Sequence, residues 1–329
     1  MRLVLGLPGL LAADPVPPLP GLARLLRAAG SPAGGAPTIA HALAQDYGVE
    51  RAGDWPLAAL RLAALGHDPK RDWWLAADPV TLVAGPADVR LAGAVTDLST
   101  TETEALVDAL NAHFATDGLN FVAATPDAWF VGSATAHAVT THPLACAIGQ
   151  PLRALLPDGP AGRTWRRWSH EIEMLLSPHP VNRARDAAGR ALANGLWWSD
   201  GGALPAGGRS PGATFADDRL IEALAAHGGE QARAVPADLA AARRAAATAD
   251  TLVVVLPSPL DTATLEAAWT RAAWEALLAG ELDPVVVVTD GDGRALTWTA
   301  TRPGLWARFA ARATPPALSA LLRPAPPQP

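Results

Sequence analysis

The stretch Leu252–Val288, LVVVLPSPLDTATLEAAWTRAAWEALLAGELDPVVVV, decides the fold class of this 329-residue chain. It begins and ends with short continuous apolar runs, Leu252–Leu256 and Val285–Val288. Between them, residues 261–278 carry apolar side chains at helical spacing, and Gly280 follows as a typical helix stop. Two strands joined by one helix form a βαβ unit, whose strands run parallel and are covered on both faces. The stretch therefore predicts an α/β protein with a mostly parallel sheet, in which these two runs are neighbouring or near-neighbouring strands.

The sequence on either side of this stretch supplies further elements of the same core. Residues 2–6 form an apolar run and are predicted to be a strand, and residues 19–29 have the spacing of an amphipathic helix. After the second valine run, the turn residues 290–293 lead into 294–300, where apolar and polar side chains alternate. This pattern predicts a β-hairpin at the end of the core.

The pattern changes between about residue 85 and residue 159. Val89–Val95 is predicted to be a strand, and Ser99 and Glu102 have the spacing of a capping box at the start of a helix. Two further short apolar runs follow as predicted strands, at 121–122 and 129–131. A strand, a helix and two strands in this order indicate an inserted α+β subdomain. The predicted division is a core of 1–84 and 160–329 with an insertion of 85–159.

The composition is that of an ordinary soluble globular protein, since half of the residues are apolar and 18% are charged. The net charge of −6 argues against a broad nucleic-acid surface. Cys146 is the only cysteine, which excludes an internal disulfide and a thiolate metal cluster.

The start of the chain, MRLVLGLPGLLAAD, has the outline of a signal peptide. We interpret it instead as the first buried strand followed by a loop. No run of 18 or more apolar residues is present to span a bilayer. We therefore expect a cytoplasmic protein without a membrane partner.

A second distinctive stretch is His179–Gly202, HPVNRARDAAGRALANGLWWSDGG. Pro180 suits the first turn of a helix, because its missing N–H needs no partner there. We predict a helix over 181–192, a short strand at 196–198 and a turn at 200–202.

The order of residues in this stretch resembles the HPVN-x-x-R-x-x-x-G-x-x-x-x-N segment of the archaeal-type cofactor-independent phosphoglycerate mutases. It is more similar still to their bacterial relatives of the RpfE regulatory type. The matching positions are His179, Pro180, Val181, Asn182, Arg185, Gly189, Asn194, Trp197, Gly201 and Gly202. A weaker similarity runs from about residue 73 to residue 205, through Trp74-Leu75, Asp78-Pro79-Val80, 110–115, 117–119 and 156–159.

The resemblance implies an alkaline-phosphatase-like core with an insertion on the substrate side. The mutases use two divalent cations, a nucleophilic Ser or Thr, and clustered Asp and His at the ends of core strands. Such a metal pair stabilises both the attacking and the leaving oxygen of phosphoryl transfer. The present chain departs from this pattern, because its first strand leads into Leu7-Pro8-Gly9 and no histidine follows His227.

The carboxylates near the expected strand ends have other interpretations. They are Asp14, Asp261, Asp290 and Asp292. Asp261 has the position of a helix N-cap, and Asp290 and Asp292 have that of turn residues. We therefore predict no catalytic residues, no metal site and no cofactor.

The positions that the resemblance places on the substrate side match this chain better than those of the metal site do. Asn182, Arg185 and Asn194 stand at matching positions, and arginine is suited to bidentate contact with phosphate or carboxylate. We predict that these three residues converge on one cleft and bind a ligand. The alternative for the arginines of this segment, which include Arg183 and Arg190, is a solvated helix face.

Three functional hypotheses follow. The first is a non-catalytic, regulatory relative of the mutases that binds a small phosphorylated or carboxylate metabolite or a protein partner. The second is an active metal-dependent phosphoglycerate mutase or phosphatase with a rearranged site. The third is a structural or interaction protein without a ligand.

Overall fold

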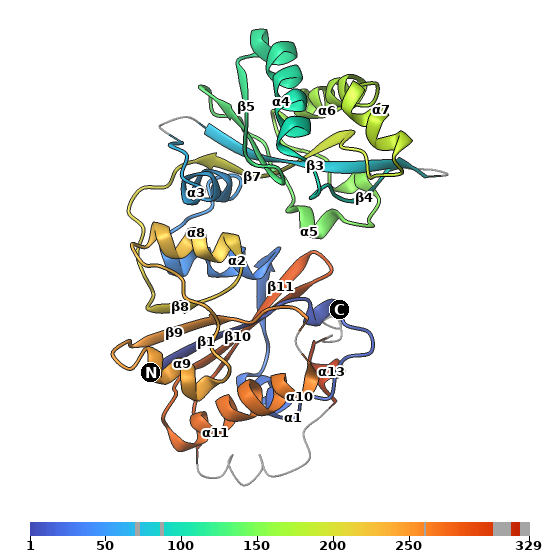
Figure 1. Ribbon diagram of the computed structural model, residues 1–329. Coiled ribbons are helices and arrows are strands. Elements are labelled where there is room, and N and C mark those ends of the chain that lie inside the picture. Colours follow the sequence, from blue (N-terminus) through green and yellow to red (C-terminus); the bar gives the residue numbers. More distant parts are fainter. Residues whose placement is uncertain (70–72, 86–88, 260, 305–316, 323–329) are drawn as a thin grey trace. The chain divides into compact units, whose positions relative to one another are not determined.

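The computed structural model describes the chain except for residues 70–72, 86–88, 260, 305–316 and 323–329. The chain forms two compact units, shown in Figure 1. The first consists of Met1–Gly48 and Gly207–Pro329, and the second of Val49–Ala206. The insertion expected from the sequence, 85–159, therefore lies inside the second unit, which begins earlier and ends later than those boundaries.

The first unit is built on a six-stranded, mostly parallel sheet with the order β2-β11-β10-β1-β9-β8. Strand β1 lies between β9 and β10 and pairs in parallel with both. The two apolar runs that decide the fold class are thus near neighbours on either side of β1, as predicted. The hairpin is also confirmed, because β11 pairs antiparallel with β10. The strands are β1 (Arg2–Leu7), β2 (Ala33–Ala36), β8 (Ala213–Phe215), β9 (Thr251–Val255), β10 (Val285–Gly291) and β11 (Arg294–Ala300).

Helices cover both faces of this sheet (Figure 1). One face carries Leu3, Leu5 and Val287 and packs in one apolar cluster with side chains of α1, α9, α11 and α13. The helix α2 packs on the other face, where Ile39 and Val255 both lie close to Gly6. The helical segments are η1 (Leu10–Ala12), α1 (Pro20–Ala29), α2 (Ile39–Leu43), η2 (Ala44–Tyr47), α8 (Arg219–His227), α9 (Leu239–Ala245), α10 (Thr262–Thr264), the π-helix η5 (Leu265–Thr270), α11 (Arg271–Ala279) and α13 (Leu318–Leu322).

A buried glutamate joins α1 to the π-helical segment. Both carboxylate oxygens of Glu266 accept from the backbone N–H of Gly21, at 3.0 and 3.1 Å, and the Thr270 hydroxyl donates to the same group at 2.6 Å. The N-terminus of α1 thus receives its acceptor from another helix, because its own N-cap, Leu19, has no polar side chain. This contact holds the two helices close together, and only glycine fits at position 21.

The second unit contains an antiparallel sheet centred on the long strand β3 (Trp73–Ala84). β3 pairs with β6 at residues 73–76, with β4 at 80–84 and with β7 along 73–80. The other elements are α3 (Leu57–Ala64), β4 (Val89–Ala94), α4 (Thr100–Phe114), η3 (Ala115–Asp117), β5 (Leu119–Thr125), β6 (Ala128–Ser133), α5 (Leu144–Ala147), η4 (Leu152–Ala154), α6 (Gly162–Leu176), α7 (Pro180–Ala187) and β7 (Gly195–Ala203).

Alternation along the first residues of β3 separates two of the apolar cores of this unit. Trp73, Leu75 and Ala77 belong to one apolar cluster with side chains of α4 and α6, such as Leu106 and Trp165. Trp74 and Ala76 point the other way and pack with residues of α3 and with Phe130. Because successive side chains of a strand point to opposite faces, one apolar strand supplies both cores.

Two expectations for the distinctive stretch are wrong in detail. Helix α7 ends at Ala187, earlier than expected, and Gly189 follows with a φ of 66°. The residues 200–202 are not a turn, because β7 continues through them to Ala203. Within the described residues, no helix is long and apolar enough to cross a membrane.

Substitution of Gly21 by alanine is expected to destabilise the first unit by about 1–3 kcal/mol, the usual cost of overpacking. The added Cβ would lie 2.5 Å from the backbone nitrogen of Arg271 and 2.8 Å from the carbonyl carbon of Thr270. Urea unfolding measures the change. Gly93→Ala is the control, since no atom lies within 4 Å of its Cβ position, and it is expected to change stability by less than about 0.5 kcal/mol. Equal effects of the two substitutions would contradict the close approach of α1 and α11.

Candidate functional site

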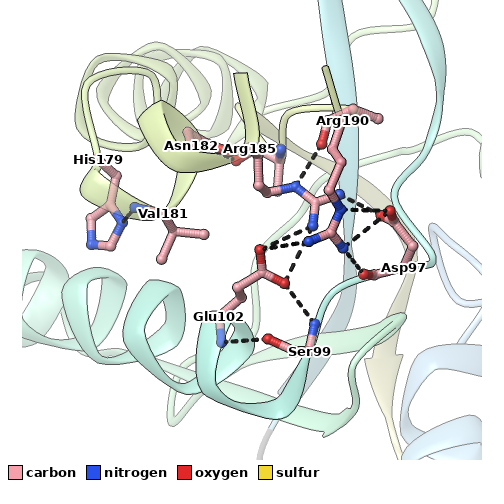
Figure 2. A network of polar contacts seen from close by, with 10 residues as sticks. Asp97, Ser99, Glu102, His179, Val181, Asn182, Arg185 and Arg190 are labelled. Atoms are coloured by element: carbon pink, nitrogen blue, oxygen red, sulfur yellow. Dashed lines mark hydrogen bonds and ion pairs between the residues drawn. The ribbon is translucent and has the colours of Figure 1, made fainter. Parts of the chain in front are cut away.

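The predicted ligand-binding arginine lies in a partly buried network of ion pairs between the α7 region and the start of α4 (Figure 2). The Arg185 side chain is fully buried. Its Nη1 donates to both oxygens of Glu102, at 3.2 and 3.3 Å, and its Nη2 donates to Asp97. Its Nε donates to the carbonyl of Ala191 at 2.7 Å. All three nitrogens of the guanidinium group therefore have protein acceptors.

The second arginine of the network is more accessible. Arg190 donates to Asp97 Oδ2 at 3.2 Å and to Glu102 Oε1 at 3.3 Å, and its side chain is 40% exposed. Glu102 also accepts from the backbone N–H of Ser99, whose hydroxyl in turn accepts from the backbone of Glu102. The capping box predicted from the sequence is thus confirmed, and the same glutamate joins it to both arginines.

The charges of this network set the direction of two pKa shifts. Hydrogen bonds from Arg185, followed by those from Arg190, lower the pKa of Asp97. Burial opposes the shift at Glu102, but hydrogen bonds from Ser99 and the nearby Arg185 lower its pKa overall. A carboxyl group whose pKa is lower in the folded state stabilises the fold above its ordinary pKa and loses this effect as the pH falls.

The two predicted asparagines bind the backbone. The Asn182 amide nitrogen donates to the carbonyls of Leu176 and Ala193, at 2.8 and 2.9 Å, and its oxygen accepts from the N–H of Ala193. Asn194 binds both backbone groups of Leu82, through its oxygen at 2.7 Å and its nitrogen at 2.9 Å. These contacts fasten the segment between α7 and β7 to its neighbours.

The solvated helix face is wrong for Arg185, which is 1% exposed, and it describes Arg183, which is exposed on α7. Arg190 lies beyond the end of α7 and pairs with Asp97 and Glu102. Asn182 lies on α7 with Arg185 and is also 1% exposed. Ligand binding by Asn182, Arg185 and Asn194 stays a prediction. Any ligand of Arg185 has to compete with Asp97 and Glu102.

The carboxyl ends of the parallel strands are the second candidate site. Asp290 accepts from the backbone N–H of Gly9 at 2.9 Å and from that of Ile39 at 3.0 Å. The expected turn position is wrong for Asp290, which lies in β10 and joins the loop after β1 to the start of α2. The N-cap role of Asp261 is confirmed by its bonds to the N–H groups of Ala263 and Thr264.

A small hollow opens beside these strand ends. Its volume is about 180 Å³, and it lies where β1 and β9 end, mostly between apolar and proline side chains. The hydroxyl-bearing residues of its lining are Ser258 and Thr262. Within the residues that the structure describes, no group of three or more His, Cys, Asp or Glu side chains is arranged to hold a metal ion.

A buried carboxylate cluster in the second unit was not foreseen. Leu75 of β3 lies opposite both Asp200 and Gly201, because the register of β3 and β7 shifts there. This β-bulge turns two backbone N–H groups away from the ladder. The N–H of Asp200 donates to the Thr141 hydroxyl at 3.1 Å, and that of Gly201 donates to Asp54 at 3.3 Å.

Asp54 is only 4% exposed and accepts three further hydrogen bonds. They come from the backbone of Trp55 at 2.9 Å, the backbone of Thr141 at 3.1 Å and the Thr141 hydroxyl at 2.5 Å. Burial raises the pKa of Asp54, the Thr141 hydrogen bond opposes this shift, and the charge of Asp200 adds to it. Asp200 itself has a φ of 65°, which is uncommon outside glycine.

An ion pair lies next to this cluster. Arg61 on α3 forms a two-pronged contact with Asp78 on β3, and one of its bonds measures 3.0 Å. The Arg61 guanidinium also lies over the Phe130 ring, 4.9 Å from its centroid. No local sequence pattern indicates this site, because its members are scattered from residue 54 to residue 200. The Asp200-Gly201-Gly202 string is the one local signal, and its composition predicts a turn where the structure has a strand.

Comparisons with known proteins find only distant similarity. No family model and no curated protein matches the chain. Among solved structures, it is similar to the cofactor-independent phosphoglycerate mutase from Thermoplasma acidophilum DSM 1728, with 18% identity and a TM-score of 0.40 over 92% of this chain and 90% of that one. It is also similar to the PH0037 protein from Pyrococcus horikoshii, with 11% identity and a TM-score of 0.47 over 91% and 87% of the two chains.

Replacement of Arg185 by alanine is expected to destabilise the second unit by about 3 kcal/mol, the lower end of the cost of breaking a buried ion pair. The lower end applies because the Asp97 side chain is 55% exposed, so its carboxylate can be hydrated when Arg185 is removed. Arg183→Ala, on the same helix, is the matched control, since that side chain is exposed and donates only to the Pro178 carbonyl among the bonds described. Chemical unfolding of both variants measures the difference. A loss below about 0.5 kcal/mol for Arg185→Ala would contradict its structural role.

Proposed function

We propose that this chain is a non-catalytic relative of the cofactor-independent phosphoglycerate mutases, of the RpfE regulatory type, and that it binds a small phosphorylated or carboxylate metabolite. The regulatory role and the type rest on the sequence resemblance in His179–Gly202. The proposed absence of catalysis rests on one observation in the first unit, which is that both oxygens of Asp290 already accept backbone hydrogen bonds.

In open α/β sheets, ligands bind outside the carboxyl ends of the strands. Asp290 is the carboxylate that β10 brings to this edge, and both of its oxygens already accept backbone N–H groups, from Gly9 and Ile39. Asp261 is likewise engaged by the start of its own helix. Carboxylates that serve the backbone in this way are poorly placed to ligate a pair of divalent ions as well.

The binding part of the proposal concerns Arg185 and Arg190. Both guanidinium groups face Asp97, whose side chain is 55% exposed. A phosphate or carboxylate offers arginine the same two-pronged contact that an aspartate does. We propose that the ligand displaces Asp97 from the two arginines, while Glu102 keeps its place in the capping box.

Purified without chelator, the protein is expected to contain no stoichiometric divalent metal and to turn over no phosphoglycerate when manganese is added. Without bound metal ions, neither Ser258 nor Thr262, the hydroxyl side chains beside the strand ends, has a partner to stabilise its ionised form or the phosphoryl charge. Elemental analysis and a mutase assay measure the two quantities. One or two tightly bound ions per chain with turnover above background would favour the alternative, an active mutase or phosphatase with a rearranged site.

Removal of the competing carboxylate is expected to strengthen anion binding. Asp97→Asn should lower the concentration of inorganic phosphate or phosphoglycerate that stabilises the protein, and thermal shift titrations measure it. A ligand at 100 times its Kd adds about 2.7 kcal/mol to the folded state. Asp117→Asn is the control, because Asp117 contacts Trp168 and Arg167 outside this network. Unchanged or absent anion-dependent stabilisation in Asp97→Asn would exclude Arg185 and Arg190 as the site.

A further inference from the structure

We propose that Asp97 is an internal stand-in for the ligand, and that an anion which displaces it releases the turn 95–99 between β4 and α4. The contacts of Asp97 with Arg185 and Arg190 are called the latch below. The inference rests on the proposed function, because it takes the two arginines as the binding site. It adds to that function a way in which binding changes the protein.

The latch connects two segments that lie at opposite edges of β3. Val80 of β3 is paired with Ala94, the last residue of β4, on one edge, and with Gly195, the first residue of β7, on the other. The turn 95–99 continues from Ala94, and the segment 188–194 leads into Gly195. Hydrogen bonds between these two segments therefore join the chain on one side of β3 to the chain on the other.

The segment before β7 is fastened by contacts that do not involve Asp97. The Asn194 side chain binds both backbone groups of Leu82, at 2.7 and 2.9 Å. The Thr81 hydroxyl donates to the carbonyl of Leu192 at 2.7 Å. This side of the latch therefore keeps its place when Asp97 is displaced.

The turn 95–99 is anchored at its ends and exposed in its middle. Val95 is 1% exposed, and its N–H donates to a carbonyl of β3 at 2.9 Å. Leu98 is 5% exposed and packs in the apolar cluster of α4 and α6. The two residues between these anchors, Thr96 and Asp97, are both exposed. What holds the middle of the turn is therefore the latch itself.

Asp97 takes part in the latch with all of its oxygen atoms (Figure 2). Its carboxylate accepts from Nη2 of Arg185 and, at 3.2 Å, from Nε and Nη2 of Arg190. Its backbone carbonyl accepts from Nη2 of Arg190 as well. Every hydrogen bond described for Thr96 and Asp97 thus comes from these two arginines.

An anion and Asp97 exclude each other at the latch, because both use the same two-pronged contact with arginine. Since the anion binds only the state in which Asp97 has left, binding and release of the turn are coupled. Glu102 still accepts from Arg185 at 3.2 Å and from Arg190 at 3.3 Å, and its capping box holds the start of α4. Binding is thereby converted into a change confined to the surface at residues 96 and 97.

A spin label at position 96 reports this release, and Cys146 is the only native cysteine that has to be replaced. In the full chain with Cys146→Ser and Thr96→Cys, the label is expected to be restrained without ligand and to become mobile as inorganic phosphate is added. Its half-response should fall at the phosphate concentration that gives half of the thermal stabilisation. Sodium chloride at equal ionic strength is the reference, because salt alone weakens exposed ion pairs. A label introduced by Glu104→Cys, at an exposed position of α4, is the matched control and should not respond.

Two variants test the latch without any ligand. Asp97→Ala should mobilise the label at position 96 in the absence of phosphate, and added phosphate should then change its spectrum little. Arg190→Gln should mobilise the label in part, because it removes the contacts to both the carboxylate and the backbone carbonyl of Asp97.

The latch and the proposed function fail separately. Thermal stabilisation by phosphate with an unchanged label at position 96 would overturn the latch and leave anion binding in place. No response to phosphate in either measurement would overturn both. A label as restrained in Asp97→Ala as in the labelled parent chain would overturn the latch whatever phosphate does.

Discussion

The first unit depends on the pairing of its N-terminal strand with two strands from the other end of the chain. Arg2 lies opposite Thr251, and Leu3 lies opposite Val285. The backbone carbonyls at the end of β1 also accept hydrogen bonds from residues far away in the sequence. The Thr289 hydroxyl donates to the Leu7 carbonyl, and the Leu256 N–H donates to the Gly6 carbonyl. Between these partners the chain forms the whole second unit. Such an insertion costs little in loop entropy, because each doubling of loop length adds only about 0.6 kcal/mol.

The elements of this core were predictable because their patterns are local. An apolar run that is followed by a helical pattern and then by a second apolar run indicates a βαβ unit, and this predicted β9 and β10 as neighbouring or near-neighbouring strands. The insertion boundaries and the course of β7 were not predictable in the same way. Asp200-Gly201-Gly202 has the composition of a turn, and it stays extended because Thr141 and Asp54, far away in the sequence, accept the hydrogen bonds of its bulge.

In the candidate functional site, too, local patterns were predictable and contacts between distant segments were not. The sequence resemblance singled out Arg185, and the spacing of Ser99 and Glu102 predicted a capping box. No sequence pattern indicated that these two features are in contact. Their contact depends on how α7 packs against α4. Because of it, the arginine that was expected to bind a ligand donates to the carboxylates of Glu102 and Asp97 instead. Such a pair is weak evidence for net stability, because desolvation offsets much of the attraction, yet loss of either partner is costly. A residue can therefore match the motif of a ligand-binding segment and still have its hydrogen bonds taken up within the protein.

The two acidic clusters of the second unit respond to pH in opposite directions. Asp97 and Glu102 have lowered pKa values, so their contribution weakens as the pH falls, whereas the raised pKa of Asp54 makes its contribution strongest in acid. In a single unfolding curve for the unit these dependences partly cancel. A flat stability profile across the acidic range is thus compatible with two sites whose pKa values are shifted in opposite directions, and only measurements that resolve α7 from residues 49–56 separate the two contributions.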